Sequence, residues 1–187
     1  KLPGCVVKTV SGSDLMQLVA QNLGREVKEL PVGFKYIAAE MLSGEVLIGG
    51  EESGGIGFGM HLPERDALFA ALLVLEALNA GGQPLGARLS ELKKRFGSSY
   101  YERIDLRLEN MDSRHRLEAL LDEDPPSSIA GQAVKEVIRT DGIKMRLGRS
   151  FWLMLRFSGT EPLLRIYCEA PNQNTLKKNI ELGKATS

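Results

Sequence analysis

In the first half of the chain, short apolar runs alternate with segments whose apolar residues recur at helical spacing. The runs are rich in β-branched residues, which is typical of buried strands. Leu15, Leu18 and Leu23 fall on one face of a predicted helix that Ser13 or Asp14 can cap. Strands are therefore expected at residues 5–7, 26–29 and 46–48, and helices at 14–23 and 36–42. This alternation predicts an α/β layered domain, with a mixed sheet and helices on both faces.

The most apolar segment is a predicted helix from Ala67 to Ala80, in which only Glu76 and Asn79 are polar. Because it is apolar on every side, we expect it to be a buried central helix, with Asp66 as its N-cap. A stretch rich in glycine follows and favours a domain boundary. The predicted domains are residues 1–83 and residues 84–187.

The second half of the chain has the pattern of an antiparallel sheet. From Tyr100 to Leu108, apolar and polar residues alternate, as in a half-buried strand. Asp141-Gly142 is typical of a tight hairpin turn between two strands. Strands are also expected at 134–140, 143–146, 151–155 and 164–168, and helices at 112–121 and from about 174. The second domain is therefore predicted to be α+β, with an antiparallel sheet and helices on one face.

The composition argues against several classes of protein, among them those that bind nucleic acid or membranes through bulk charge. The chain has 187 residues, 43% of them hydrophobic, and its formal net charge is zero, so bulk charge gives no support to nucleic-acid or membrane binding. The longest apolar stretch is too short to cross a bilayer. Cys5 and Cys168 are far apart and indicate neither a metal site nor a disulfide framework, which favours a reducing cytoplasm. The chain begins with Lys1 rather than Met, so we expect it to be part of a longer protein.

The segment Arg156-Phe157-Ser158-Gly159-Thr160-Glu161-Pro162 lies between two predicted strands. Arg156 offers a planar fork that can bond two phosphate oxygens, and the hydroxyls of Ser158 and Thr160 can donate to an anion. Gly159 lets the backbone come close to a ligand. A plain surface hairpin loop is the alternative, but the residue types together favour a phosphate site.

A second polar loop, residues 49–59, holds six glycines, two carboxylates and a hydroxyl. Glu51 and Ser53 are of the types that bond neutral sugar hydroxyls. The glycine spacing does not fit a dinucleotide fingerprint, and no His or Asp completes a metal ligand set. A flexible turn with solvated acids is the alternative.

Arg65 precedes the long apolar helix and would stand beside its N-terminus, a favourable position for an anion. A solvated arginine is the alternative. His61 and His115 are the only histidines, and neither has a visible catalytic partner. The sequence therefore predicts binding residues and no catalytic residue.

Three motifs resemble those of the α-D-phosphohexomutases, the phosphoglucomutase/phosphomannomutase family. The segment from Arg156 to Pro162 resembles the phosphate-binding loop of their last domain, with Phe157 where many members have proline. Gly50-Glu51-Glu52-Ser53-Gly54 looks like their sugar-binding loop, and Pro31 to Tyr36 is similar to another substrate-contacting turn. Lys8 stands where the family places a basic residue that faces the cleft. The match implies the third and fourth of four domains.

The resemblance implies a role in exchanging hexose 1-phosphate and hexose 6-phosphate through glucose 1,6-bisphosphate. The phosphorylated serine and the Mg²⁺ site would belong to the first two domains, so this chain alone is expected to be inactive, with no metal of its own. Arg165 is expected to support the loop or to pair with Glu161 or Glu169. The implied ligand contacts are Glu51, Ser53, Gly33, Phe34, Lys8 and Arg65 for the sugar, and Arg156, Ser158, Gly159 and Thr160 for the non-transferred phosphate.

The substrate and the context stay open at this point. Glu52 and Gly55 lean toward glucose phosphate mutases rather than mannose-dual or glucosamine enzymes. The alternatives are part of a phosphoglucosamine mutase and a stand-alone, non-catalytic module that binds phosphosugars.

Overall fold

The computed structural model describes residues 2–185 and divides the chain into two compact units, Lys1–Gly97 and Ser98–Ser187. The boundary predicted after residue 83 is not where the units divide, because helix α4 (Leu85–Phe96) belongs to unit 1 and contacts helix α1 (Asp14–Asn22) there. The glycines at 81 and 82 end a helix within unit 1 instead of ending the domain.

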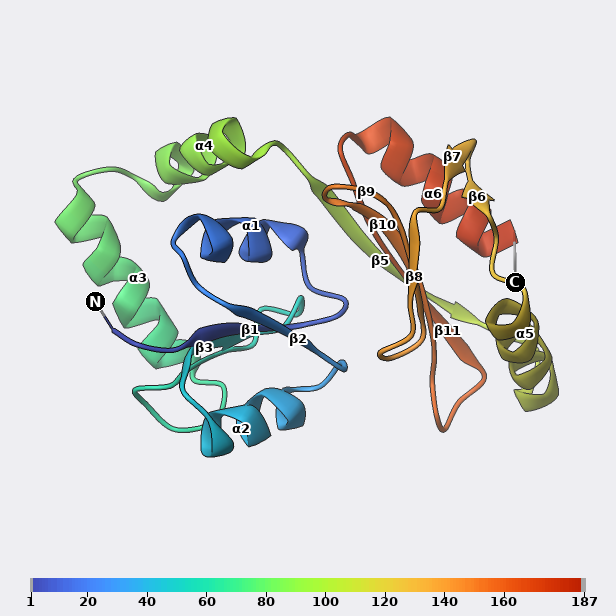
Figure 1. The fold of residues 1–187 in the computed structure, drawn as a ribbon, viewed down its shortest axis with the longest axis horizontal. Coiled ribbons are helices and arrows are strands. Elements are labelled where there is room, and N and C mark those ends of the chain that lie inside the picture. Colours follow the sequence, from blue (N-terminus) through green and yellow to red (C-terminus); the bar gives the residue numbers. More distant parts are fainter. Residues whose placement is uncertain (1, 186–187) are drawn as a thin grey trace. The chain divides into compact units, whose positions relative to one another are not determined.

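Unit 1 is built on a four-stranded mixed sheet with strand order β2-β1-β3-β4. Strand β1 is parallel to both β2 and β3, whereas β3 and β4 are antiparallel. Figure 1 shows α1 and α2 on opposite faces of this sheet, as the sequence predicts. The elements of unit 1 are β1 (Cys5–Thr9), α1 (Asp14–Asn22), β2 (Val27–Leu30), α2 (Phe34–Ser43), β3 (Val46–Gly50), β4 (Ile56–Phe58), α3 (Ala67–Gly81) and α4 (Leu85–Phe96).

Polar side chains start two helices of unit 1. The Ser13 hydroxyl accepts a hydrogen bond from the backbone N–H of Leu15 at 3.1 Å, so Ser13 is the N-cap of α1. Asp66 caps α3 as predicted, since its carboxylate accepts from the backbone N–H of Phe69 at 2.9 Å. His61 also bonds Asp66, at 2.9 Å, and its ring stacks on that of Phe69. Asp66 therefore fixes the start of α3 to the segment that follows β4.

The prediction that α3 is a buried central helix is wrong. None of its residues is buried, and Leu68 and Leu72 are 81% and 64% exposed. Within unit 1 it contacts β4, where the rings of Phe69 and Phe58 meet edge to face at 5.4 Å, and Arg88 of α4 donates to the carbonyl of Ala77 at 2.9 Å. An apolar composition shows that a helix needs cover, but not which element supplies it. Among residues 2–185 no single helix is long and apolar enough to cross a membrane; α3 and α4 meet that test only as a pair, bent by 83°.

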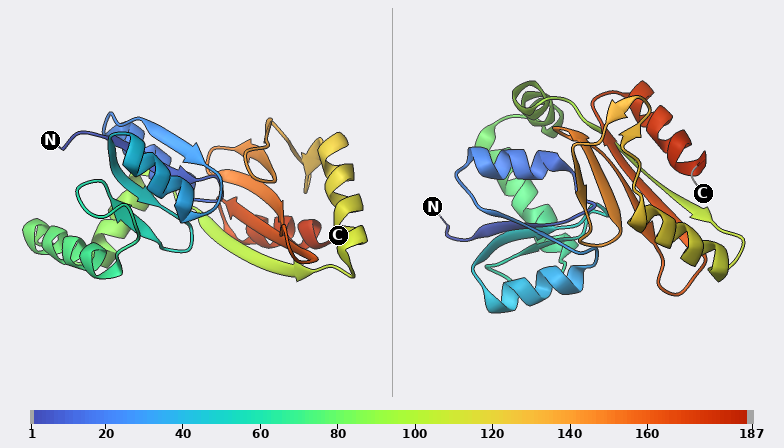
Figure 2. Two further views of the ribbon diagram at one scale, coloured as in Figure 1. Left: turned by 90° about the horizontal axis from the view of Figure 1, so that it is seen from below. Right: turned by 45° about the vertical axis from the view of Figure 1, so that its right-hand side comes forward.

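Unit 2 is built on a five-stranded antiparallel sheet with strand order β5-β11-β10-β9-β8, and a short two-stranded ribbon of β6 and β7. Helices α5 and α6 lie on the same face of the five-stranded sheet (Figure 2), as predicted. The elements of unit 2 are β5 (Tyr100–Arg107), α5 (Met111–Glu123), β6 (Ser128–Ile129), β7 (Gln132–Ala133), β8 (Glu136–Ile138), β9 (Ile143–Gly148), β10 (Phe151–Phe157), β11 (Leu163–Ala170) and α6 (Gln173–Ala185).

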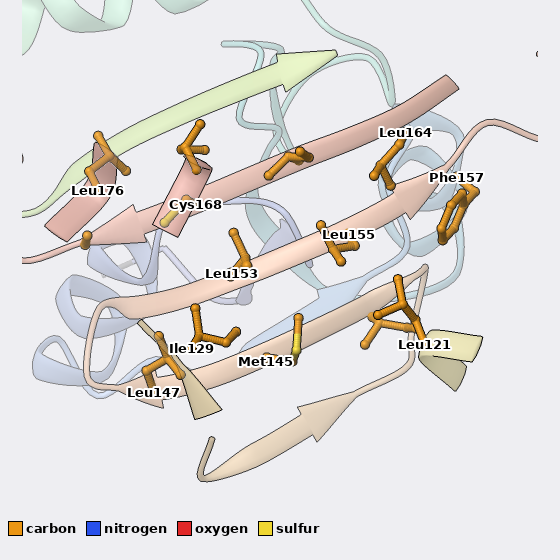
Figure 3. Close-up of a cluster of buried hydrophobic side chains, with 14 of the residues drawn as sticks. Leu121, Ile129, Met145, Leu147, Leu153, Leu155, Phe157, Leu164, Cys168 and Leu176 are labelled. Carbon is orange, nitrogen blue, oxygen red and sulfur yellow. The ribbon is translucent and has the colours of Figure 1, made fainter. Parts of the chain in front are cut away.

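The core of unit 2 lies between this sheet and its two helices, and Figure 3 shows its side chains. Leu153, Leu155 and Phe157 of β10 all belong to this core. Because successive residues of a strand point to opposite faces, the alternate residue Arg156 lies on the face of the sheet away from the core. The alternation of β10 thus presents the predicted phosphate-binding arginine at the end of the strand, next to the loop that follows.

Candidate functional site

The candidate site of unit 1 lies at the carboxyl edge of its parallel strands. In register, Lys8 near the end of β1 stands between Glu29 of β2 and Gly50 of β3, so the three strands end side by side. The loops that follow them carry the sequence motifs singled out above. The crevice outside the carboxyl ends of parallel strands is where ligands bind in open α/β sheets. The chain order therefore brings the predicted sugar-contacting segments together within one unit.

The acidic loop is a tight connection between β3 and β4. The backbone N–H of Glu51 donates to the carbonyl of Gly55 at 2.9 Å, and that of Gly54 donates back to the Glu51 carbonyl at 3.1 Å. The Glu51 side chain is only 8% exposed, and burial raises the pKa of its carboxyl while the nearby Arg65 guanidinium acts to lower it. Ser53 is exposed at the tip of the loop. Glu51 and Ser53 therefore present an oriented acceptor and a free hydroxyl.

Arg65 lies against this loop and is about half exposed. Its guanidinium is 3.4 Å from Glu51 and stands over the ring of Phe34, 5.3 Å from the ring centre. A Cβ added to Gly55 would come within 2.6 Å of the Arg65 side chain and 2.9 Å of the Glu51 carboxylate. Glycine at position 55 is therefore what lets Arg65 rest beside Glu51.

Two residues of the predicted turn at Pro31 to Tyr36 take different places. Gly33 is the N-cap residue of α2, with φ of 131° and no side chain to cap the helix. Phe34 is buried in the core between the sheet and α2, and its ring supports Arg65. Phe34 therefore supports the site through its contact with Arg65, while Gly33 lies at the edge of the site.

The structure does not offer Lys8 to a ligand, contrary to the expectation from the sequence. Its amino group donates to the carbonyl of Gly12 at 3.0 Å and pairs with Glu29 at 2.6 Å and Asp14 at 3.7 Å. One carbonyl and two carboxylates therefore surround the ammonium, and the side chain is fully buried. The cause is the register of β1 and β2, which sets Lys8 opposite Glu29.

Sequence reasoning missed the attachment of Glu52. Its carboxylate accepts hydrogen bonds from the hydroxyls of Ser11, at 2.6 Å, and Thr9, at 3.2 Å. Thr9 is the last residue of β1 and Ser11 lies in the turn after it, about forty residues earlier in the chain, so no local pattern signals the contact. Glu52 thereby ties the acidic loop to the neighbouring strand instead of pointing freely into solvent.

The candidate phosphate loop of unit 2 connects β10 to β11. The backbone N–H of Ser158 donates to the Leu163 carbonyl at 2.9 Å, and Ser158 is largely buried. Gly159 and Thr160 are exposed at the tip. A Cβ added to Gly159 would meet no atom within 4 Å, so packing does not require glycine there and the loop leaves room for a ligand. The four predicted residues, which begin with Arg156, are thus brought together as one short segment.

Both facing arginines at this end of the sheet lie near a carboxylate. The Nε–H of Arg156 donates to Asp141 at 2.9 Å, and Arg165, directly opposite Arg156 on β11, lies 3.8 Å from Asp105. The expected pairing of Arg165 with Glu161 or Glu169 is therefore wrong, because Asp105 faces it in register on β5. Arg103 binds Asp105 through two hydrogen bonds of 2.7 Å and lowers the pKa of that carboxyl.

Family models cover both units. The model described as "Phosphoglucomutase/phosphomannomutase, alpha/beta/alpha domain III" matches residues 1–96, and the model of the C-terminal domain of the same family matches residues 106–181. The chain belongs to the phosphoglucomutase/phosphomannomutase family. The family resemblance expected from the sequence motifs is thereby confirmed.

Curated relatives carry several substrate names. A phosphoglucomutase/phosphomannomutase of Thermococcus kodakarensis is 29% identical over 96% of this chain, and a phosphoglucosamine mutase of Pseudomonas putida is 32% identical over all of it. These matches cover 37% and 38% of the two relatives, so the chain spans about a third of their length. A solved structure from Thermus thermophilus, assigned as a phosphomannomutase, is 32% identical with a TM-score of 0.78, over 98% of this chain and 36% of that one.

Proposed function

We propose that this chain is the substrate-recognising part of a phosphohexomutase. Glu51 and Ser53 bond neighbouring hydroxyls of the sugar, with Arg65 beside them. Arg156, Ser158, Gly159 and Thr160 bind the phosphate that is not being transferred. The observation that carries the proposal is the position of the acidic loop at the carboxyl edge of parallel strands, where backbone hydrogen bonds hold the loop and the Glu51 carboxylate lies beside Arg65.

The chemistry explains why recognition and transfer are separate. An intermediate with two phosphates has to bind in two orientations. The residues that bind it therefore contact features that both orientations share, namely the ring hydroxyls and the phosphate that is not being transferred. We propose that the phosphoserine belongs to the rest of the full-length protein and that this chain alone is inactive. Measurable turnover of hexose 1-phosphate by the 187-residue chain would contradict this.

Magnesium is proposed for the full-length protein and not for this chain. Within residues 2–185 no group of three or more His, Cys, Asp or Glu side chains is placed to hold a metal ion. When bound elsewhere in the full-length protein, the ion would neutralise charge on phosphoryl oxygens. The residues of this chain bind and orient the sugar phosphate.

For the substrate we propose glucose phosphates in preference to those of mannose or glucosamine. The support is the loop itself: Glu52 accepts hydrogen bonds from the hydroxyls of Thr9 and Ser11, and Gly55 leaves no room for a side chain while Arg65 stays in place. A histidine at position 55 would displace Arg65 from Glu51. The test is the turnover of glucose, mannose and glucosamine 1-phosphates by the full-length parent protein.

Phosphate recognition is tested by titrating the ¹⁵N-labelled chain with glucose 1,6-bisphosphate and following the amides of residues 158–160. Arg156→Ala should weaken binding by about 1.5–3 kcal/mol, the usual contribution of a hydrogen bond to a charged group. Arg139→Ala is the matched control, since Arg139 is a half-exposed arginine in the same unit that pairs with Asp122 at 2.8 Å. Absence of any shift at millimolar ligand in the unaltered chain would refute the proposed phosphate site.

A further inference from the structure

Arg156 is held at only one edge of its guanidinium. Its Nε–H donates to Asp141 at 2.9 Å, and within residues 2–185 no partner engages its two Nη groups. The two side chains are 19% and 23% exposed, so the contact is shielded from water without being sealed off. The free edge with the two Nη groups offers a pair of parallel donors, the arrangement that binds two oxygens of a phosphate.

The hairpin turn between β8 and β9 brings Asp141 to this place. Gly142 has φ of 85°, a conformation that favours glycine. A Cβ added there would lie 2.4 Å from the carbonyl oxygen of Leu155 and 3.0 Å from Cα of Arg156. The turn therefore packs directly on β10 at Arg156, and this places Asp141 next to the guanidinium.

We propose that Asp141 is a positioning residue for phosphate binding: it fixes Arg156 by its Nε edge and leaves the Nη edge to the phosphate. This inference rests on the proposed phosphate site. An arginine directly opposite Arg156, Arg165 on β11, repels it at close range, so a free Arg156 would turn away from the loop. Holding the side chain in its bound conformation reduces the entropy lost when the phosphate binds.

Charge alone predicts the opposite effect, which makes the proposal testable. The carboxylate of Asp141 is close to the bound phosphate, so its removal should strengthen phosphate binding if only electrostatics mattered. If orientation dominates, its removal weakens binding. Asp141→Asn keeps an acceptor oxygen for Arg156 and removes the charge, whereas Asp141→Ala removes both.

The experiment measures the affinity of the 187-residue chain for glucose 1,6-bisphosphate by amide shifts of residues 158–160. We expect binding about tenfold weaker in Asp141→Ala and within about threefold of the unaltered chain in Asp141→Asn. Glu136→Gln is the matched control, since Glu136 is a carboxylate of the same hairpin and pairs with the Nε of a different arginine, Arg146 of β9, at 3.4 Å. The control should not change the affinity.

A double variant separates positioning from a general effect on the hairpin. In an Arg156→Ala background, Asp141→Ala should cause no further loss, because its effect acts through the arginine. The proposal would be overturned if Asp141→Ala weakened binding as much in the Arg156→Ala background as it does alone. It would also be overturned if Asp141→Ala alone left binding unchanged or made it tighter. If Arg156→Ala itself binds as well as the unaltered chain, the phosphate site fails, whatever Asp141 does.

A spectroscopic readout does not depend on the alanine variant folding. The Nε–H resonance of Arg156 should move in Asp141→Asn, because a neutral acceptor makes a weaker hydrogen bond than a carboxylate. It should stay in place in Glu136→Gln. An unmoved Nε–H resonance in Asp141→Asn would show that the contact is absent in solution and would also overturn the proposal.

Discussion

The glycines around the acidic loop are predicted to differ sharply in what an alanine costs. A Cβ added to Gly59 would lie 1.7 Å from the carbonyl oxygen of Val46, which is backbone and cannot swing aside. Gly59 also donates its N–H to Leu47 at 3.1 Å, just beyond the pairing of β3 with β4. Gly59→Ala therefore has to separate these segments, at about 3 kcal/mol or more of unfolding free energy.

Gly55→Ala should be much milder for stability. The nearest atom to its added Cβ belongs to Arg65, a flexible side chain that is 54% exposed and can move into solvent. What is lost is the 3.4 Å contact of half-exposed Arg65 with the largely buried Glu51, whose carboxylate also lies 2.9 Å from the added Cβ. We expect this to cost about 1 kcal/mol, the upper end for an ion pair open to solvent. The same change should impair sugar binding, because Arg65 leaves the site.

The assay is urea unfolding followed by the amide signals of β3 and β4. Amide signals are needed because the only tryptophan, Trp152, lies in unit 2 and reports on that unit. Gly86→Ala is the control, since its added Cβ meets no atom and helix α4 should gain up to about 1 kcal/mol. The reasoning is refuted if Gly59→Ala unfolds within about 0.5 kcal/mol of the unaltered chain, a change usual for surface substitutions.

Three further outcomes are expected. Burial raises the pKa of Glu51, so its contribution to stability is present at low pH and is lost as the pH rises through that pKa. Over the same pH range the carboxylate gains its capacity to accept hydrogen bonds from sugar hydroxyls. Carboxyl NMR should find the pKa of Glu51 above 4.5 and that of Glu64 below it, because hydrogen bonds from Arg65 lower the pKa of Glu64. Leu153→Ala should cost about 2–5 kcal/mol by Trp152 fluorescence, against about 0.5 kcal/mol for exposed Leu120→Ala. Burial raises the pKa of Cys168 to about 12, so thiol reagents should react with it only after unfolding, and rapid labelling of the folded chain would contradict this.

Local patterns predicted what depends on neighbours in the sequence. The cap at Asp66, the turn at Asp141-Gly142 and the strand predicted at 151–155, just before Arg156, all follow from short-range rules of helices, turns and alternation. The same rules placed the two motif loops at the ends of strands. For these features the chemistry is carried by consecutive residues, so a single sequence contains the necessary information.

What sequence reasoning missed depends on partners far along the chain. Lys8 was expected to face a ligand, but its register with Glu29 of β2 turns it into a buried ion pair. The hydrogen bond from Ser11 to Glu52 and the one from Arg156 to Asp141 likewise join segments that are far apart in the sequence. For α3, the sequence revealed how apolar the helix is, whereas its exposure is set by the tertiary arrangement.

The order of strands in unit 2 has a consequence for synthesis. Strand β5 comes first in this unit and pairs with β11, its last strand, over eight residues from Tyr100 to Arg107 (Figure 1). During synthesis on the ribosome, β5 cannot pair with β11 until residue 170, the last residue of β11, has left the ribosome. Meanwhile its charged residues, among them Glu102, Arg103 and Asp105, discourage the edge-to-edge aggregation to which unpaired strands are prone.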